Sequence, residues 1–153
     1  MPAVVTISVS LAFLGAAGNF VLSGYILSQN PKLKLNRAAS FFAFTAGCLA
    51  FILYSFIRSP NEVERKFWDG ALFFIEPVLT FAFAWFAHVL TEKPKFLHGK
   101  KFYLWIGIPT LLTMLLYNGF WNAPASYNII QFILRFSWFS FCFFFFLYFM
   151  YKT

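Results

Sequence analysis

Residues 67–90 read FWDGALFFIEPVLTFAFAWFAHVL, and this stretch decides which folds the chain can adopt. A helix that crosses a bilayer needs about 20 largely apolar residues, and this stretch is long and apolar enough to supply them. It also contains Glu76, Pro77 and His88. An ionisable group inside a spanning helix is costly (roughly 2.5–3.5 kcal/mol near the centre for Asp, Lys or Arg), so it usually marks a partner or a pathway. The stretch predicts a transmembrane helix in which Glu76 has a structural or functional role.

The composition of the whole chain points the same way. Of its 153 residues, 61% are hydrophobic, 24% are aromatic and only 11% are charged. A soluble domain has about 25% charged residues, so this chain has too little polar surface to cover a globule in water. We expect an all-α polytopic membrane protein that forms a single domain over residues 1–153. Cys48 and Cys142 both fall in apolar runs, where cysteine usually packs as a small apolar residue.

Five apolar runs predict a bundle of five transmembrane helices. They cover residues 3–27, 38–57, 67–90, 102–117 and 129–151. The first two runs carry small residues spaced four apart, which let helix backbones approach closely in lipid. These residues are Ser8, Ala12 and Ala16 in the first run, and Ala39, Ala43 and Gly47 in the second. Asn19 adds a polar side chain that could form a hydrogen bond between helices.

The basic residues set the expected orientation. Eight of them lie in the first and third connections and the tail: Lys32, Lys34, Arg37, Lys93, Lys95, Lys100, Lys101 and Lys152. Three lie in the second and fourth connections: Arg58, Arg65 and Lys66. The positive-inside rule places the eight in the cytoplasm, with the N-terminus outside and the C-terminus cytoplasmic. Because the charges follow membrane topology, they do not indicate a nucleic-acid partner. We expect residues 58–66 to form a mixed-charge loop.

Glu76 and Arg135 form the main candidate site. With the predicted orientation, the third and fifth spans both run inward, and the two residues lie at similar depths, roughly 10–14 Å below the outer interface at 1.5 Å per residue. We hypothesise that they face one another. Three interpretations stay open: an ion pair that fixes helix register, the polar floor of an outward-facing ligand pocket, and an ion or proton pathway. Trp85 and Asn118 are weaker candidates for contact with a ligand.

Pro77 follows Glu76 directly and removes a backbone hydrogen-bond donor from the third span. This predicts a bend, which could open a cavity beside the carboxylate or could simply help the helices to pack. His88 has no second ligand at a suitable spacing, so we expect no metal site. The sequence has no phosphate loop, nucleophile elbow or metal-binding pattern. We therefore expect no enzymatic activity and no cofactor.

The first basic turn carries a more specific pattern. Its elements are Asn30-Pro31 at the end of the first span, the basic residues, and Asn36-Arg37 ahead of Phe41, Phe42 and Phe44. This pattern resembles the seven-helix N-terminal sensor region of bacterial histidine kinases, a module that also precedes diguanylate cyclases and phosphatases. The third span is similar to the same module, with Pro77 in its outer half and Thr91 at a basic exit. The resemblance covers roughly residues 22–95.

The resemblance implies an outside N-terminus, seven helices, a homodimer in the bacterial inner (cytoplasmic) membrane, and a cytoplasmic output domain. The sequence departs from this pattern, because it stops after the fifth predicted span, before two helices and any output domain. We expect either a piece of a longer protein or a short relative that works with other proteins.

These observations predict a membrane-embedded sensor, the input module of a signal-transduction protein. Its partners would be the lipid bilayer and a small-molecule or lipid ligand that enters from the outer side. A small transporter or channel subunit is the alternative, and it predicts polar residues along a path through the membrane. Polar groups are few in the inner halves of the predicted spans. A structural membrane-assembly subunit, in which Glu76 and Arg135 only orient helices, is a further alternative.

Overall fold

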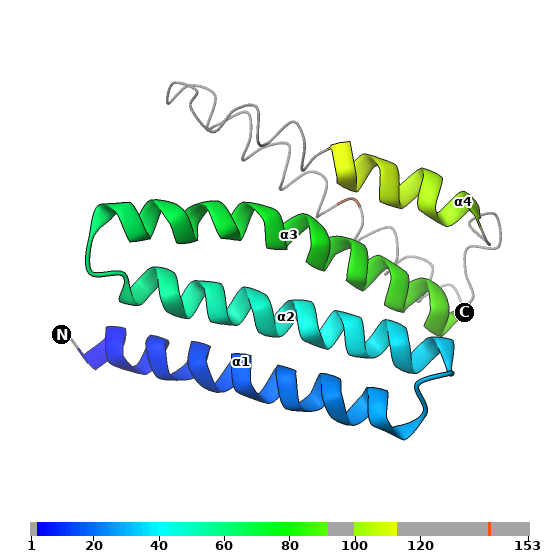
Figure 1. Cartoon of the computed structure of the whole chain (residues 1–153), viewed down its shortest axis with the longest axis horizontal. Coiled ribbons are helices and arrows are strands. Elements are labelled where there is room, and N and C mark those ends of the chain that lie inside the picture. The colour runs from blue at the N-terminus through cyan, green and yellow to red at the C-terminus, as the bar shows by residue number, and fades with distance from the viewer. Residues whose placement is uncertain (1–2, 92–99, 113–140, 142–153) are drawn as a thin grey trace. The chain divides into compact units, whose positions relative to one another are not determined.

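The computed structural model describes residues 3–91, 100–112 and 141, and these segments are helical apart from short connections. Three long helices come first: α1 (Ala3–Gln29), α2 (Lys34–Arg58) and α3 (Glu62–Thr91) (Figure 1). A short helix α4 (Lys100–Phe102) continues into a π-helical turn η2 (Tyr103–Gly107) and a helical stretch over residues 108–112. In this described part of the chain, α1, α2 and α3 are long and apolar enough to cross a membrane.

The first three predicted spans fall on α1, α2 and α3. The fourth, residues 102–117, is described as far as residue 112, and most of it is helical up to that point. The fifth, residues 129–151, lies outside the described residues except for Phe141.

The loop predicted for residues 58–66 is wrong over most of its length, because α3 begins at Glu62. Asn61 explains this early start. Its Oδ1 accepts a hydrogen bond of 2.9 Å from the backbone N–H of Glu64, and its Nδ2 donates one of 3.1 Å to Glu64 Oε1. The first bond is that of an N-cap, and the second joins the two side chains in place of the backbone bond that would complete a capping box. The carboxylates of Glu62 and Glu64 also favour the positive end of the helix dipole.

The chain divides into two compact units, Met1–Leu79 and Thr80–Thr153, and α3 contributes to both. In the first unit, α1 and α2 lie side by side as an antiparallel pair (Figure 1). Their contact is built from small residues. Ala16 and Ala43 are buried, and a Cβ atom added to Gly15 would lie 3.9 Å from the Cβ of Ala50. Small residues allow such close backbones, as expected from the sequence.

Gly47 shows how close the approach is. A Cβ atom at this position would lie 2.9 Å from Cδ1 and Cε1 of Phe20 and 3.3 Å from the Cβ of Asn19. The Phe20 ring instead lies over the glycine and makes a tilted contact with Phe44, with ring centroids 5.6 Å apart. Glycine at this position therefore leaves room for an aromatic side chain from the neighbouring helix.

The π-helical turn η2 has a local cause. Pro109 has no backbone N–H to donate to the carbonyl of Trp105, so a regular α-helix cannot continue its hydrogen bonds through this point. The helix widens over Tyr103–Gly107, just ahead of the proline. By contrast, α3 continues as α-helix through Pro77.

Candidate functional site

Glu76 and Pro77 lie within α3, in the first unit. The side chain of Glu76 is half-buried and Pro77 is buried. Of the residues expected to accompany Glu76, Arg135 and Asn118 lie outside the described residues. Their proximity to Glu76 stays a prediction.

Trp85 belongs to the second unit. It packs, partly buried, against a cluster made by Ala84 and Ala87 of α3 together with Phe102 and Ile106. All four members of this cluster are at most 2% exposed. The indole thus takes part in the contact between the Thr80–Thr91 part of α3 and the helical segment that begins with α4.

His88 is buried in the same unit. Its ring stacks on that of Phe102, with centroids 5.0 Å apart and an interplanar angle of 14°. Phe81 contacts the same phenylalanine from one side, with centroids 5.8 Å apart. In the part of the chain that the structure describes, no group of three His, Cys, Asp or Glu side chains could hold a metal ion. The stacking makes His88 an aromatic packing partner in this contact.

Asn30 organises the turn between α1 and α2. Its Oδ1 accepts a hydrogen bond of 3.1 Å from the backbone N–H of Lys32, and its carbonyl accepts one of 3.2 Å from Leu33 N–H. The side chain of Asn36 donates a further bond of 3.3 Å to the same carbonyl. Pro31 lies between these partners, where its fixed φ suits a turn. Arg37 lies exposed in the first turns of α2, with its backbone N–H bonded to the carbonyl of Leu33 (3.1 Å).

Ser23 and Ser40 form the polar link between α1 and α2, a pair that the sequence analysis did not single out. Each hydroxyl lies 2.9 Å from the backbone carbonyl of the other serine, and the two hydroxyl oxygens are 2.9 Å apart. Both side chains are buried. Asn19, the predicted source of such a bond, donates instead to the carbonyl of Gly15 in its own helix, at 2.8 Å.

The spacing of the small residues held a signal for this pair. Ser23 lies seven residues after Ala16, and Ser40 lies seven before Gly47. Seven residues return a helix to nearly the same face, so both serines continue the lines of the small residues already buried.

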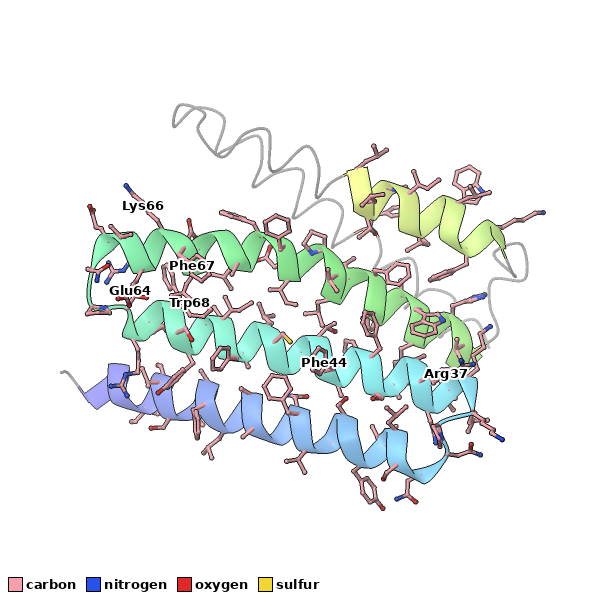
Figure 2. All side chains as sticks on the ribbon, viewed as in Figure 1. Arg37, Phe44, Glu64, Lys66, Phe67 and Trp68 are labelled. Carbon is pink, nitrogen blue, oxygen red and sulfur yellow. The ribbon has the colours of Figure 1, made fainter. Side chains whose placement is uncertain are left out.

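Aromatic side chains gather at the other end of this helix pair, near the connection between α2 and α3. We call this group the aromatic cluster; its members are Phe13, Phe51, Tyr54, Phe67 and Trp68. Trp68 makes edge-on contacts with Phe51 and Phe67, with centroids 5.9 and 5.1 Å apart. Tyr54 contacts Phe13 at 5.5 Å and Phe51 at 6.5 Å. Figure 2 shows Phe67 and Trp68 beside Glu64 near the start of α3.

Arg58 is attached to this cluster. Its Cζ lies 5.9 Å from the centroid of the Tyr54 ring, and its Nη1 donates a hydrogen bond of 3.4 Å to the Tyr54 hydroxyl. A guanidinium over an aromatic face gains a cation–π attraction of about 0.5–1 kcal/mol at exposed sites. Aromatic rings with a cation and polar tips are typical of the membrane–water interface, where one end of a side chain is apolar and the other is wet.

Comparison of the sequence with protein-family models, with curated proteins and with solved structures finds no match in any of the three. We therefore infer the function from the chemistry of the described residues. Three features stand out among these residues. Glu76 lies beside Pro77 in the long apolar helix α3, and α1 and α2 form a close pair. The two ends of that pair differ in charge, because one end has acidic residues among its cations.

Proposed function

We propose that the chain is the membrane-embedded input module of a bacterial signal-transduction protein. It would couple a ligand or lipid signal from the outer side to a cytoplasmic output domain. The observation that carries this proposal is the pair Glu76–Pro77 inside α3, a half-buried carboxylate directly before a buried proline. A carboxylate in an apolar span is costly, so its presence calls for a partner or a ligand.

Pro77 provides a point at which α3 can bend to transmit the signal. Because proline cannot donate the backbone hydrogen bond, bending α3 there costs less than bending a regular helix. A ligand that contacts Glu76 better in one arrangement of α3 than in another would shift the population between them, and only that difference in affinity can transmit a signal.

The proposed site includes residues beyond Glu76. We propose Arg135 as the opposite charge, with Trp85 and Asn118 as weaker candidates for ligand contact. The proposed arrangement has five spans in the inner membrane, with the N-terminus outside and the C-terminus in the cytoplasm. If the module belongs to a histidine kinase, we expect it to work as a homodimer.

Lys32, Lys34 and Arg37 in the turn between α1 and α2 support this orientation, since no acidic residue accompanies them on α1 or α2 and the positive-inside rule places such a turn in the cytoplasm. Reporter fusions test the orientation directly. Green fluorescent protein joined after Lys34 should fluoresce, and alkaline phosphatase joined after Glu64 should be active. Activity of phosphatase after Lys34 and its absence after Glu64 would reverse the proposed topology.

The coupling is tested by removing the charge of Glu76. Both native cysteines are first replaced (Cys48→Ala and Cys142→Ala), and spin labels are attached at Lys34→Cys and Thr91→Cys. Pulsed electron paramagnetic resonance in lipid nanodiscs then measures the distance between the start of α2 and the end of α3. We expect Glu76→Gln to change the distance distribution. The matched variant Glu62→Gln, which alters an exposed carboxylate in the first turn of α3, should leave it unchanged. Identical distance distributions in the labelled chain, in Glu76→Gln and in Glu62→Gln would contradict coupling through Glu76.

A flux measurement separates this proposal from the transporter alternative. Proteoliposomes containing the chain should leak protons and potassium no faster than empty liposomes. A flux that depends on the protein and disappears in Glu76→Gln would favour an ion pathway and contradict the sensor function.

A further inference from the structure

The turn between α1 and α2 carries three exposed cations within six residues: Lys32, Lys34 and Arg37. We call these residues the basic turn. The first 61 residues of the chain contain no Asp or Glu, so no acidic residue on α1 or α2 balances them. Among the residues that the structure describes, no carboxylate lies in ion-pair contact with the three cations. Their charge is therefore not neutralised by the acidic residues that the structure describes.

The other end of the helix pair is different. Arg58, Arg65 and Lys66 lie there among the acidic residues Glu62, Glu64 and Asp69. Arg58 is also held against the ring of Tyr54. Figure 2 shows the contrast, with Arg37 at one end of α2 and Glu64 and Lys66 near the opposite end. Both ends carry three cations, but among residues 3–91 the basic turn has no acidic residue near it in sequence, whereas the other end has three.

The depth of the basic turn follows from the apolar residues around it. The apolar part of α1 ends at Leu27, and that of α2 begins at Ala38. At 1.5 Å per residue, Lys34 and Arg37 lie within about 6 Å of the start of the apolar run, which corresponds to the headgroup layer of a bilayer. Exposed Tyr25, Leu27 and Leu33 place apolar surface directly beside the cations. A ligand with an anionic head and an apolar tail matches this combination.

We propose that the basic turn binds the phosphate headgroup of an anionic phospholipid, whose acyl chains lie against the exposed apolar residues of α1. The guanidinium of Arg37 can bind two phosphate oxygens at once, and the lysines act as point charges beside it. The hydrogen bonds that converge on Asn30 hold the backbone around Lys32, so the site is partly preorganised. A soluble acidic protein fits less well, since headgroups already surround cations at this depth.

The test compares two variants that remove equal charge from the two ends. The full chain is reconstituted in nanodiscs of phosphatidylcholine in which about a third of the lipid is phosphatidylglycerol, an anionic-leaflet composition. After extraction, mass spectrometry counts the phosphatidylglycerol that stays bound. Each cation near an anionic surface corresponds to about a fivefold gain in binding. We expect K32Q/K34Q/R37Q to retain at least about tenfold less of this lipid, and R58Q/R65Q/K66Q to lose less than about twofold.

Equal losses in the two triple variants would overturn the proposal, because net charge alone would then explain the binding. Equal retention of phosphatidylcholine and phosphatidylglycerol by the unaltered chain would also overturn it. A third variant, K32R/K34R, keeps the charge and the guanidinium of Arg37, and it should retain the lipid as the unaltered chain does. If it loses as much phosphatidylglycerol as the glutamine variant, lipid retention depends on the local fold rather than on the charge, and the proposal fails.

A competition arm separates the lipid from a free phosphate. Soluble glycerol phosphate should displace little phosphatidylglycerol, because it has no acyl chains to contact α1. Displacement at the same concentration as a short-chain phosphatidylglycerol would show a site for free phosphate esters, and would overturn the lipid assignment. Because the nanodiscs have the same lipids in both leaflets, none of these results depends on the orientation or on the sensor function proposed above.

Discussion

The contact between α1 and α2 differs in kind from the contact that the later part of α3 makes with the segment beginning at α4. In the first, small residues bring two backbones together and two serines bond reciprocally across the contact. In the second, Ala84 and Ala87 receive the large side chains of Phe102 and Ile106. Inside a bilayer, lipid tails would be as apolar as these side chains, so neither contact would gain from leaving water. The first must draw its stability from close approach and hydrogen bonds, and the second from filled volume.

The largest effect should come from emptying the second contact. Phe102→Ala removes a ring that is 2% exposed and that stacks on His88. We expect a loss of about 3 kcal/mol in the free energy of unfolding, the low end for phenylalanine truncation in a core. Titration with dodecyl sulfate in mixed micelles measures this quantity. Leu104→Ala, at an exposed position of the same segment, is the control and should cost less than about 0.5 kcal/mol.

The next effect should come from overfilling the first contact. Gly47→Leu places a side chain where a Cβ atom alone already lies 2.9 Å from Phe20, so α1 and α2 must separate. We expect a loss of about 2 kcal/mol in the same titration. Gly47→Ala should cost less, because the ring of Phe20 is 37% exposed and can move away.

Gly18→Leu is the matched control, since nothing lies within 4 Å of a Cβ atom at that position. Its unfolding free energy should stay within about 0.5 kcal/mol of the unaltered chain. Equal losses from Gly47→Leu and Gly18→Leu would contradict close approach at Gly47 as the cause, because helix propensity favours leucine over glycine at both positions.

A smaller effect isolates the hydrogen bonds of the first contact. Ser23→Ala, Ser40→Ala and the double variant form a cycle whose coupling energy we expect to be about 0.6 kcal/mol, with an upper limit near 1.7 kcal/mol. The expected value is modest because each single variant leaves the remaining hydroxyl a backbone carbonyl to bond. Ser28→Ala removes an exposed hydroxyl that bonds only within α1, and it should have no measurable effect. A coupling energy of zero would show that the contact between the two hydroxyls adds nothing to the packing between α1 and α2.

The smallest effect should come from a residue outside both contacts. Asn61→Ala removes the cap of α3 but no packing between helices. We expect a loss of about 0.5 kcal/mol, the low end for a lost cap, since the site is exposed. Hydrogen exchange should then speed up at residues 62–65 and stay unchanged at the Ser23–Ser40 contact. Faster exchange at both places would mean that the start of α3 and the α1–α2 pair open together.

Part of the α1–α2 contact could be predicted from the small residues of the sequence, but the residues that extend it along each helix could not. The stripe of Ala43 and Gly47 lies in the contact, whereas Ser40 rather than Ala39 extends it as a buried residue. Four residues turn an α-helix by about 40° more than a full turn, so a stripe spaced by four drifts off the contact. Alternating steps of three and four stay on it. The same drift leaves Ser8 exposed and brings Ser23 into the contact.

The candidate site divides in the same way. An ionisable residue inside an apolar run is visible in any sequence, so Glu76 and Pro77 could be singled out without a structure. The residues that contact such a site from other helices cannot be predicted from the sequence, because packing sets the rotation of each helix about its own axis. For this reason the sequence does not predict the reciprocal serines, and the bond between helices predicted for Asn19 is instead made within its own helix.

The sequence by itself determined that the chain is helical and apolar enough for a membrane, where the first three long helices fall, and where the cations gather. These properties depend on run length, composition and the rule that backbone polar groups must be satisfied within a helix in lipid. Only the tertiary structure decided that Ser23 meets Ser40 and that His88 lies flat on Phe102. Such contacts depend on which faces of two helices meet, and that choice emerges from close packing between distant segments.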